Sequence, residues 1–251
     1  MNVNAIILAA GRGRRLEHLT QNRPKCLVEL GGRPLINWQI DALRGGGIDQ
    51  IATVGGYKSE LLHFPDIARM VNTRWQETEM VASLLCASAW LERTPCVVSY
   101  ADIFYPAAIV SDLSSSAADI AISYDPNWLD LWRQRFTDPL SDAESFALAY
   151  DGTLTEIGGK AATVDEIKGQ YMGLLYFTPA GWAVVTKYLA LLSDAEIDRL
   201  SMTALLARLI GRGVKILAIA LHGQWGEIDS PEDLHLYEAM MTADRRSDPT
   251  L

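Results

Sequence analysis

The sequence predicts an α/β fold, a three-layer α/β/α domain built on a mixed, mainly parallel sheet. Three observations lead to this class: short apolar runs alternate with helix-like stripes from residue 5 to residue 122, a glycine-rich turn follows the first run, and no interdomain linker interrupts the chain. Such alternation is typical of a parallel sheet with helical crossovers. We therefore expect residues 1–251 to form a single domain, within the size range of one large α/β unit.

Each strand of the first half is predicted from a short apolar run, and each helix from apolar residues three and four positions apart. The expected strands are 5–10, 48–54, 96–100 and 120–124. The expected helices are 34–44, which carries an apolar stripe, and 78–91. Three consecutive glycines from Gly45 end the first helix, as glycine often does at helix C-termini.

The regular alternation breaks between about residues 125 and 169, where tryptophans, prolines and an acidic stretch replace it. We interpret this segment as an insertion that forms a lid. Within it, Asp151 and Gly152 predict the turn of a β-hairpin over 146–157, because this dipeptide favours two-residue hairpin turns. Beyond it, we expect strands at 171–177 and 214–220, a helix at 202–210, and a polar tail that frays after Ala239.

The overall charge and the cysteines narrow the class of protein. A formal net charge of −9 at pH 7 argues against a nucleic-acid partner, because attraction to phosphates needs a basic face. No apolar run approaches the roughly 20 residues of a membrane span, and the N-terminus lacks the pattern of an export signal. Cys26, Cys86 and Cys96 form no CxxC pair, which favours reduced thiols. We expect a cytoplasmic monomer or homodimer with no membrane partner.

The stretch LAAGRGRRL places glycines and arginines directly after the first expected strand. Glycines let backbone N–H groups approach phosphates, and Arg15 and Lys25 supply positive charge. The spacing of Gly11 and Gly13 also suggests a dinucleotide-binding loop. The third glycine of that fingerprint is absent, however, and no acidic residue ends the second strand. An NAD-dependent oxidoreductase is therefore disfavoured.

Three segments, LAAGRGRRL, RPKCLVELGGRPLI and WGEIDSPEDL, together resemble the signature of the nucleotidyltransferase family that activates sugar phosphates, phosphocholine and related phosphomonoesters. The resemblance implies a Rossmann-like nucleotidyltransferase fold whose glycine-rich loop wraps a nucleoside triphosphate. It implies that Arg15 and Lys25 contact the phosphates and act in catalysis, and that Asp102 and Asp229 bind Mg²⁺ as the cofactor. Glu227 lies two residues before Asp229, on the same face if the chain is extended, and is a further metal candidate.

The chemistry of nucleotidyl transfer requires these residue types independently of the resemblance. It brings anionic phosphates together, so the site needs cations and in-line positioning. Asp102 follows an apolar strand, which places its carboxylate at the edge of the sheet where α/β folds bind ligands. Asp229 also suits a helix start, because Ser230 and Pro231 follow it, and both interpretations stay open. Lys25 is expected to face solvent, so that Lys25→Ala leaves folding intact.

The resemblance favours the phosphocholine and phosphonate cytidylyltransferase branch, because the PxG or GTA element of the sugar nucleotidyltransferases is absent. This branch implies CTP as the nucleotide. It places Thr78, Glu79 and Ser83 near the base or ribose, although all three also fit helix capping and an exposed helix surface. The expected nucleotide contacts are Leu8, Ala9, Ala10, Gly11, Arg12, Gly13, Arg15, Lys25, Thr78, Glu79, Ser83 and Asp102.

The insertion resembles that of family members encoded with phosphonate pathways, which implies transfer of CMP to a small phosphonate or phosphomonoester with release of pyrophosphate. As a lid, the insertion is expected to lie beside the acceptor pocket. Trp128, Trp132 and Tyr171 are candidates to face a cationic or small organic head group. Arg133, Arg135, Lys160 and Lys168 are candidates to hold the phosphoryl group, and the two lysines are the better ones. Tryptophans at this place also fit packing of the lid onto the body.

Arg133 and Arg135 lie on different faces of the helix expected there, so a regular helix cannot turn both inward. Two other functions stay open. One is a sugar- or inositol-phosphate nucleotidyltransferase. The other is a non-catalytic nucleotide-binding protein, which would keep the glycine-rich loop but would not need two separated metal acids.

Overall fold

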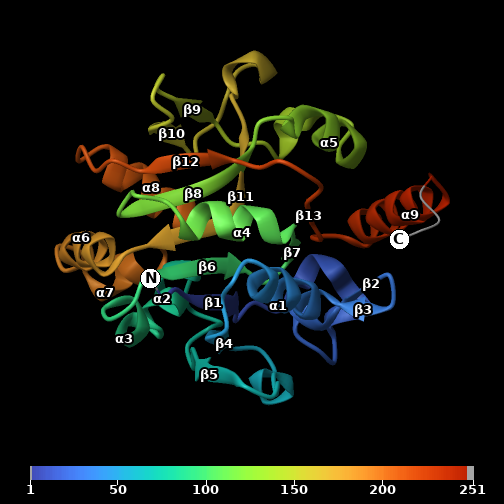
Figure 1. Ribbon diagram of the computed structural model, residues 1–251, viewed down its shortest axis with the longest axis horizontal. Coiled ribbons are helices and arrows are strands. Elements are labelled where there is room, and N and C mark those ends of the chain that lie inside the picture. Colours follow the sequence, from blue (N-terminus) through green and yellow to red (C-terminus); the bar gives the residue numbers. More distant parts are fainter. Residues whose placement is uncertain (1, 248–251) are drawn as a thin grey trace.

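The computed structural model describes residues 2–247, and a seven-stranded sheet forms its centre (Figure 1). The strands are β1 (Asn4–Ala9), β4 (Ile51–Gly55), β5 (Ile67–Val71), β6 (Cys96–Tyr100), β8 (Ile120–Asp125), β11 (Gln170–Phe177) and β12 (Leu217–Ala220). Their order is β12-β8-β11-β6-β1-β4-β5. Only β11 runs antiparallel to its neighbours in this sheet. The predicted mixed, mainly parallel sheet is confirmed.

Helices lie on both sides of this sheet (Figure 1). On one side, α1 (Leu35–Gly45) packs against α4 (Ala107–Ser114). The remaining helices before the C-terminal one are α2 (Met80–Leu85), α3 (Ser88–Leu91), α5 (Trp128–Arg135), α6 (Pro179–Leu189), α7 (Asp194–Asp198) and α8 (Met202–Ile210). Among them, α2 packs against α7 and α8. The three-layer arrangement expected from the alternating pattern is therefore present.

The central strands are apolar because both faces of the sheet are covered. Residues 5–9 of β1 are all buried, as expected for a parallel strand between two helical layers. On α1, Leu35, Ile36, Ile40 and Leu43 are buried, which is the apolar stripe that the spacing predicted. These residues fix the orientation of β1, and thereby of the glycine-rich loop that follows it.

Two small antiparallel ladders lie outside the main sheet and bear on the site. β2 (Glu29–Leu30) pairs with β3 (Arg33–Pro34), and β7 (Ile103–Phe104) pairs with β13 (Gly226–Glu227). Short 3₁₀ turns cover Arg14–Thr20, Lys25–Leu27, Ser59–Leu61, Pro139–Ser141 and Val164–Glu166. The β7–β13 pair joins a segment near the middle of the chain to one near its C-terminal end.

The insertion at 125–169 contains α5 and the predicted hairpin, formed by β9 (Phe146–Leu148) and β10 (Leu154–Ile157). Gly152 has a φ of +79° in the connecting turn, a conformation that favours glycine. The hairpin is attached to the main sheet, because the Leu154 N–H donates to the Ile216 carbonyl at 2.8 Å and the Ala218 N–H to the Gly152 carbonyl at 3.0 Å.

Several element boundaries differ from the expectation. β5 was not predicted, because this edge strand buries little and its exposed positions hide the alternation. The helix expected over 78–91 begins at Met80 and is interrupted between α2 and α3, where Ala87 leaves the helical region at φ −104° and ψ 11°. Strands β4 and β12 each begin three residues later than expected.

The expectation of a fraying tail after Ala239 is wrong for the described part. Helix α9 (Pro231–Ser247) continues past that residue, because Tyr237, Met240 and Met241 pack against an apolar cluster around Leu30. Residues 248–251 of the expected tail lie outside the described residues. Within residues 2–247, no helix combines the length and apolar character that crossing a membrane requires.

Candidate active site

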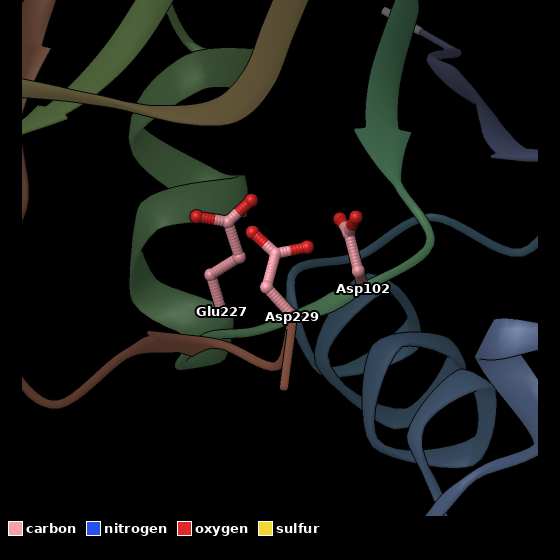
Figure 2. A group of neighbouring side chains, drawn as sticks. All are labelled: Asp102, Glu227 and Asp229. Carbon is pink, nitrogen blue, oxygen red and sulfur yellow. The ribbon is translucent and has the colours of Figure 1, made fainter. Parts of the chain in front are cut away.

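Three carboxylates from two distant segments meet beside the end of β6 (Figure 2). Asp102 lies in the turn between β6 and β7, Glu227 ends β13, and Asp229 follows just before α9. One oxygen of each carboxylate lies within 4.8 Å of the others. The β7–β13 ladder and a hydrogen bond from the Ile228 N–H to the Asp102 carbonyl at 2.9 Å bring the segments together.

This donor set suits a hard divalent cation. All three groups offer carboxylate oxygens, the ligands that Mg²⁺ prefers. Asp102 Oδ1 is buried and has no hydrogen-bond partner among residues 2–247, although buried polar atoms in proteins are normally paired. An ion held by these carboxylates would satisfy that atom. The predicted metal candidates Asp102, Glu227 and Asp229 are therefore brought together with suitable chemistry.

Lys25 lies between two of these acids. Its Nζ is 2.7 Å from Asp102 Oδ2 and 2.5 Å from Asp229 Oδ1. Burial lowers the pKa of Lys25, but the carboxylates of Asp102, Asp229 and Glu227 outweigh it, so that the pKa lies above its usual value. The expectation that Lys25 faces solvent is wrong, because only 12% of its side chain is exposed.

Arg15 approaches the same cluster from the glycine-rich loop. One guanidinium nitrogen, Nη2, lies 2.9 Å from Asp229 Oδ2, while 68% of the Arg15 side chain is exposed. Burial tends to raise the pKa of Asp229, but Lys25 and Arg15 more than offset this and hold that pKa below its usual value. The two predicted catalytic cations thus lie at one metal candidate, one buried and one open to solvent.

The glycines of the loop have different physical roles. Gly13 has a φ of +70°, and a Cβ there would lie 2.9 Å from three carbons of Lys25, so this glycine leaves room for the lysine. Gly11 is exposed, and a Cβ there would meet no atom within 4 Å. Neighbouring Ala10 accepts a hydrogen bond from the Tyr57 N–H at 3.0 Å. The backbone at Gly11 is therefore open to a ligand.

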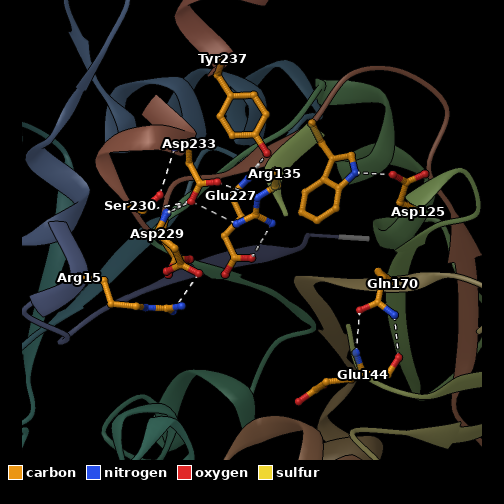
Figure 3. Close-up of polar contacts among 12 residues, drawn as sticks. Arg15, Asp125, Arg135, Glu144, Gln170, Glu227, Asp229, Ser230, Asp233 and Tyr237 are labelled. Carbon is orange, nitrogen blue, oxygen red and sulfur yellow. Dashed lines mark hydrogen bonds and ion pairs between the residues drawn. The ribbon is translucent and has the colours of Figure 1, made fainter. Parts of the chain in front are cut away.

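Arg135 was a weaker candidate than the two lysines to hold the acceptor phosphoryl group. It reaches the acidic cluster from the end of α5 (Figure 3). Its side chain is fully buried, with Nε 2.8 Å from Asp233 Oδ1 and Nη1 3.6 Å from Glu227 Oε2. Asp233 in turn accepts from the backbone N–H groups of Asp229 at 2.9 Å and Ser230 at 3.0 Å. Arg135 therefore links the insertion to the segment that carries two of the three acids.

The pKa of Glu227 shifts in the opposite direction to that of Asp229. Burial, followed by the negative charges of Asp229 and Asp102, raises the pKa of Glu227 above the usual carboxyl value, and Lys25 and Arg135 only partly oppose this. A cation bound between the carboxylates would favour the charged form of Glu227.

A cavity of about 300 Å³ opens beside the acids. Its lining comes from the glycine-rich loop, the start of α2, the end of β6, the insertion, β11, the start of α8 and the segment before α9. The lining residues are Arg15, Glu79, Met80, Tyr100, Trp132, Asp142, Glu144, Gln170, Tyr171, Met172, Gly173, Ser201, Met202, Thr203, Glu227 and Asp229. Five predicted site residues outside the glycine-rich loop thus reach the cavity, namely Glu79, Trp132, Tyr171, Glu227 and Asp229.

The other expected acceptor residues lie away from this cavity. Trp128 is 3% exposed, and its indole N–H donates to the Ile167 carbonyl at 3.2 Å, so it packs the insertion. Lys160 and Lys168 are exposed and do not line the cavity, and Lys168 Nζ donates to the Asp165 carbonyl at 2.8 Å. The structure does not bring these three residues to the acids.

Two of the expected nucleotide contacts have structural partners instead. The Asn72 amide donates to Thr78 Oγ1 at 2.9 Å and to Ser83 Oγ at 3.0 Å. Leu8 and Ala9 belong to buried β1, so only their backbone could serve a ligand. The guanidinium group of Arg12 also has a partner within the protein, because it lies over the Tyr57 ring, 5.4 Å from the ring centroid.

Sequence reasoning missed three residues that line the cavity, Asp142, Glu144 and Gln170. The backbone of Glu144 is held by Gln170, whose amide donates to the Glu144 carbonyl at 2.7 Å and accepts from its N–H at 3.2 Å (Figure 3). Burial raises the pKa of the Glu144 and Asp142 carboxyl groups. Their only sequence signal is the acidic stretch of the insertion, which carries no spacing that points to a ligand.

Comparisons with known proteins agree with this geometry. Residues 5–157 match the model of the MobA-like NTP transferase domain. The chain is 36% identical over 250 residues to a CTP:phosphoglutamine cytidylyltransferase of Campylobacter jejuni, covering 93% of this chain and 98% of that protein. It is 34% identical over 105 residues to a 2-aminoethylphosphonate cytidylyltransferase of Lancefieldella rimae, covering 40% and 43%.

Solved structures share the fold. A CTP:phosphocholine cytidylyltransferase of Streptococcus pneumoniae superposes with a TM-score of 0.72 at 22% identity, covering 96% of this chain and 100% of that one. An inositol-1-phosphate CTP transferase of T. maritima gives 0.75 at 21% identity, covering 96% and 95%. The predicted resemblance to nucleotidyltransferases, and to their cytidylyltransferase branch, is confirmed. With its glycine-rich loop beside three clustered acids, the chain belongs to the MobA-like NTP transferase family.

Proposed function

We propose that this protein transfers CMP from CTP to a small phosphorylated acceptor and releases pyrophosphate. The observation that carries the proposal is the convergence of Lys25, Arg15 and three carboxylates, of which Arg15, Glu227 and Asp229 line one cavity. The choice of CTP is supported by the 36% identity, over nearly the whole of both chains, with the CTP:phosphoglutamine cytidylyltransferase.

In the proposed reaction, an oxygen of the acceptor phosphate attacks the α-phosphorus of CTP. A new P–O bond joins the acceptor to CMP, and the bond between the α-phosphorus and the bridging oxygen breaks, so that pyrophosphate leaves with the electron pair. Lys25 and Arg15 neutralise charge on the phosphates and hold them in line. Gly11 leaves the backbone open for the approach of the triphosphate.

We assign Asp102, Glu227 and Asp229 to hold Mg²⁺. When bound, Mg²⁺ would supply positive charge to the phosphate oxygens. Lys25 pairs with both Asp102 and Asp229. Its ammonium group therefore lies beside the position at which the cation and the phosphates of the nucleotide would meet.

We propose that the acceptor occupies the cavity beside the acids. Its volume of about 300 Å³ suits a small molecule. Trp132 and Tyr171 give it an aromatic wall, while Asp142 and Glu144 line it with two carboxyl groups. Such a wall favours an acceptor whose far end carries an ammonium group. The phosphoglutamine named for the Campylobacter jejuni relative is the first acceptor to test.

In this proposal Tyr171 remains an acceptor contact. Arg15 replaces Lys160 and Lys168 as the cation nearest the acceptor phosphate, because Arg15 lines the cavity and the lysines do not. The insertion contributes one wall, and this placement supports its interpretation as a lid.

The function is tested by mixing the purified protein with MgCl₂, one of the four nucleoside triphosphates and one acceptor. The acceptors are phosphoglutamine, phosphocholine, 2-aminoethylphosphonate, inositol 1-phosphate and glucose 1-phosphate, and released pyrophosphate is measured. We expect turnover with CTP and an amine-bearing acceptor. Turnover with only a sugar or inositol phosphate would replace the acceptor class. Nucleotide binding without pyrophosphate release from any pair would identify a non-catalytic nucleotide-binding protein.

A further inference from the structure

Gln39 is a buried polar residue on the otherwise apolar inner face of α1. Its side chain is 0% exposed, and its neighbours on that face include Leu35, Ile36 and Leu43. Placing an amide in an apolar interior is unfavourable unless it forms hydrogen bonds. Leucine or methionine would fill the same space without that cost, so the contacts of the amide indicate its role.

The amide of Gln39 holds the turn that carries Asp102. Its Nε2 donates to the Tyr100 carbonyl at 2.7 Å and to the Ile103 carbonyl at 2.6 Å. These carbonyls belong to the last residue of β6 and the first of β7, and they flank Ala101 and Asp102. Both amide hydrogens are thus used on the two ends of one turn, whereas Oε1 has no partner among residues 2–247.

The same turn is held from the opposite strand. The Ile228 N–H donates to the Asp102 carbonyl at 2.9 Å, and Ile103 pairs with Glu227 in the β7–β13 ladder. Gln39 therefore fixes the turn on the side of α1, while β13 fixes it on the side of the other two acids. Between these supports, one oxygen of the Asp102 side chain contacts Lys25, and the other has no hydrogen-bond partner within residues 2–247.

We propose that Gln39 is a positioning residue for the metal site, which sets the position of the Asp102 carboxylate through the backbone of its turn. The inference rests on the proposed function for the assignment of the three acids to a divalent cation. It adds a residue from α1, outside the acidic cluster, to the determinants of ion affinity. Residues that orient metal ligands in this way change ion affinity by about 10-fold to 100-fold when they are replaced.

The test is Gln39→Met, which keeps the length of the side chain and removes both donors. Binding of Mn²⁺ alone is measured by electron paramagnetic resonance, without nucleotide or acceptor, and we expect about tenfold weaker binding than in the wild type. In the transferase assay, the Mg²⁺ concentration for half-maximal rate should rise by a similar factor, while KM for CTP at saturating Mg²⁺ changes little.

Leu43→Ala is the matched control, because Leu43 is fully buried on the same helix. It should lower Tm, because truncating a buried leucine leaves a cavity, and leave Mn²⁺ affinity unchanged, so that a stability loss is separated from a positioning effect. In Asp102→Asn, adding Gln39→Met should weaken Mn²⁺ binding little further, since effects through one group are not additive.

Wild-type Mn²⁺ affinity in Gln39→Met, or an equal loss in Leu43→Ala, would overturn the inference. Mn²⁺ binding is read without turnover, so it is independent of the substrate assignment. If Mn²⁺ affinity depends on Gln39 and Asp102 but the protein transfers no nucleotide, this inference is retained and the proposed function is contradicted.

Discussion

Arg135 Nη1 lies 3.6 Å from Glu227 Oε2, so a helix of the insertion places a buried cation against the acidic cluster. The same guanidinium makes a second, bidentate contact with Asp233 at 2.8 and 3.3 Å. Asp233 caps the backbone of Asp229 and Ser230. A single arginine thereby supports the positions of two candidate metal ligands.

Arg135→Met should destabilise the protein strongly, because it leaves the buried Asp233 and the half-buried Glu227 without this cation. Breaking a buried ion pair by removing one partner costs about 3–5 kcal/mol, which urea unfolding measures. Arg133→Met on the same helix is the control, since Arg133 is 62% exposed and only approaches Asp130 at 3.8 Å. Its effect should stay within about 0.5 kcal/mol. Equal effects of the two variants would contradict the assigned role of Arg135.

Lys25→Ala should abolish most transferase activity and also make folding depend on the metal. Without the lysine, Asp102 and Asp229 repel one another unless a divalent cation lies between them. We expect MgCl₂ to raise Tm more in this variant than in the wild type, in thermal melts with either MgCl₂ or EDTA. Wild-type turnover, or an unchanged response of Tm to MgCl₂, would remove Lys25 from the proposed site.

Asp102→Asn should depress turnover by about 100-fold or more, since a metal ligand that stabilises transition-state charge is lost. The loss should appear mainly in kcat, with a smaller change in KM for CTP. Asp112→Asn is the control, because Asp112 is exposed on α4 and its replacement should leave both constants unchanged. Retained turnover of Asp102→Asn at ordinary Mg²⁺ concentrations would refute the metal role.

Metal binding should strengthen as pH rises. The pKa of Glu227 is raised by burial and by the neighbouring carboxylates, so its proton must leave before the group binds a cation. Mn²⁺ affinity should therefore be lower at pH 6 than at pH 9, by more than in Glu227→Gln. Equal pH dependence in the variant and the wild type would show that Glu227 is not the responsible group.

Glu144→Gln should raise KM for an amine-bearing acceptor by about tenfold, because it removes a charged partner of the ammonium group. KM for CTP should not change. Glu156→Gln is the control from the same insertion, where Glu156 is exposed on β10. If Glu144→Gln alters CTP and acceptor constants alike, the cavity does not bind the acceptor through this carboxylate.

Local patterns in the sequence were sufficient for the fold class and for much of the phosphate site. The strand at 96–100 and the helix at 202–210 were predicted with the boundaries they have, because their apolar residues recur at the spacing of one element. Arg15, Lys25, Asp102 and Asp229 were proposed as site residues because short motifs around them resemble the nucleotidyltransferase signature.

The tertiary structure alone decided which side chains share a site. Glu227 meets Asp102 through the β7–β13 register, while the fold of the insertion turns Arg135 inward and leaves Lys160 and Lys168 outside the cavity. In the sequence, Gln39 is one polar residue in an amphipathic helix and has no sign of a special role. Only tertiary packing brings its amide to the turn that carries Asp102. Periodicity records which residues are buried within an element, whereas contacts between distant elements depend on how whole surfaces pack together.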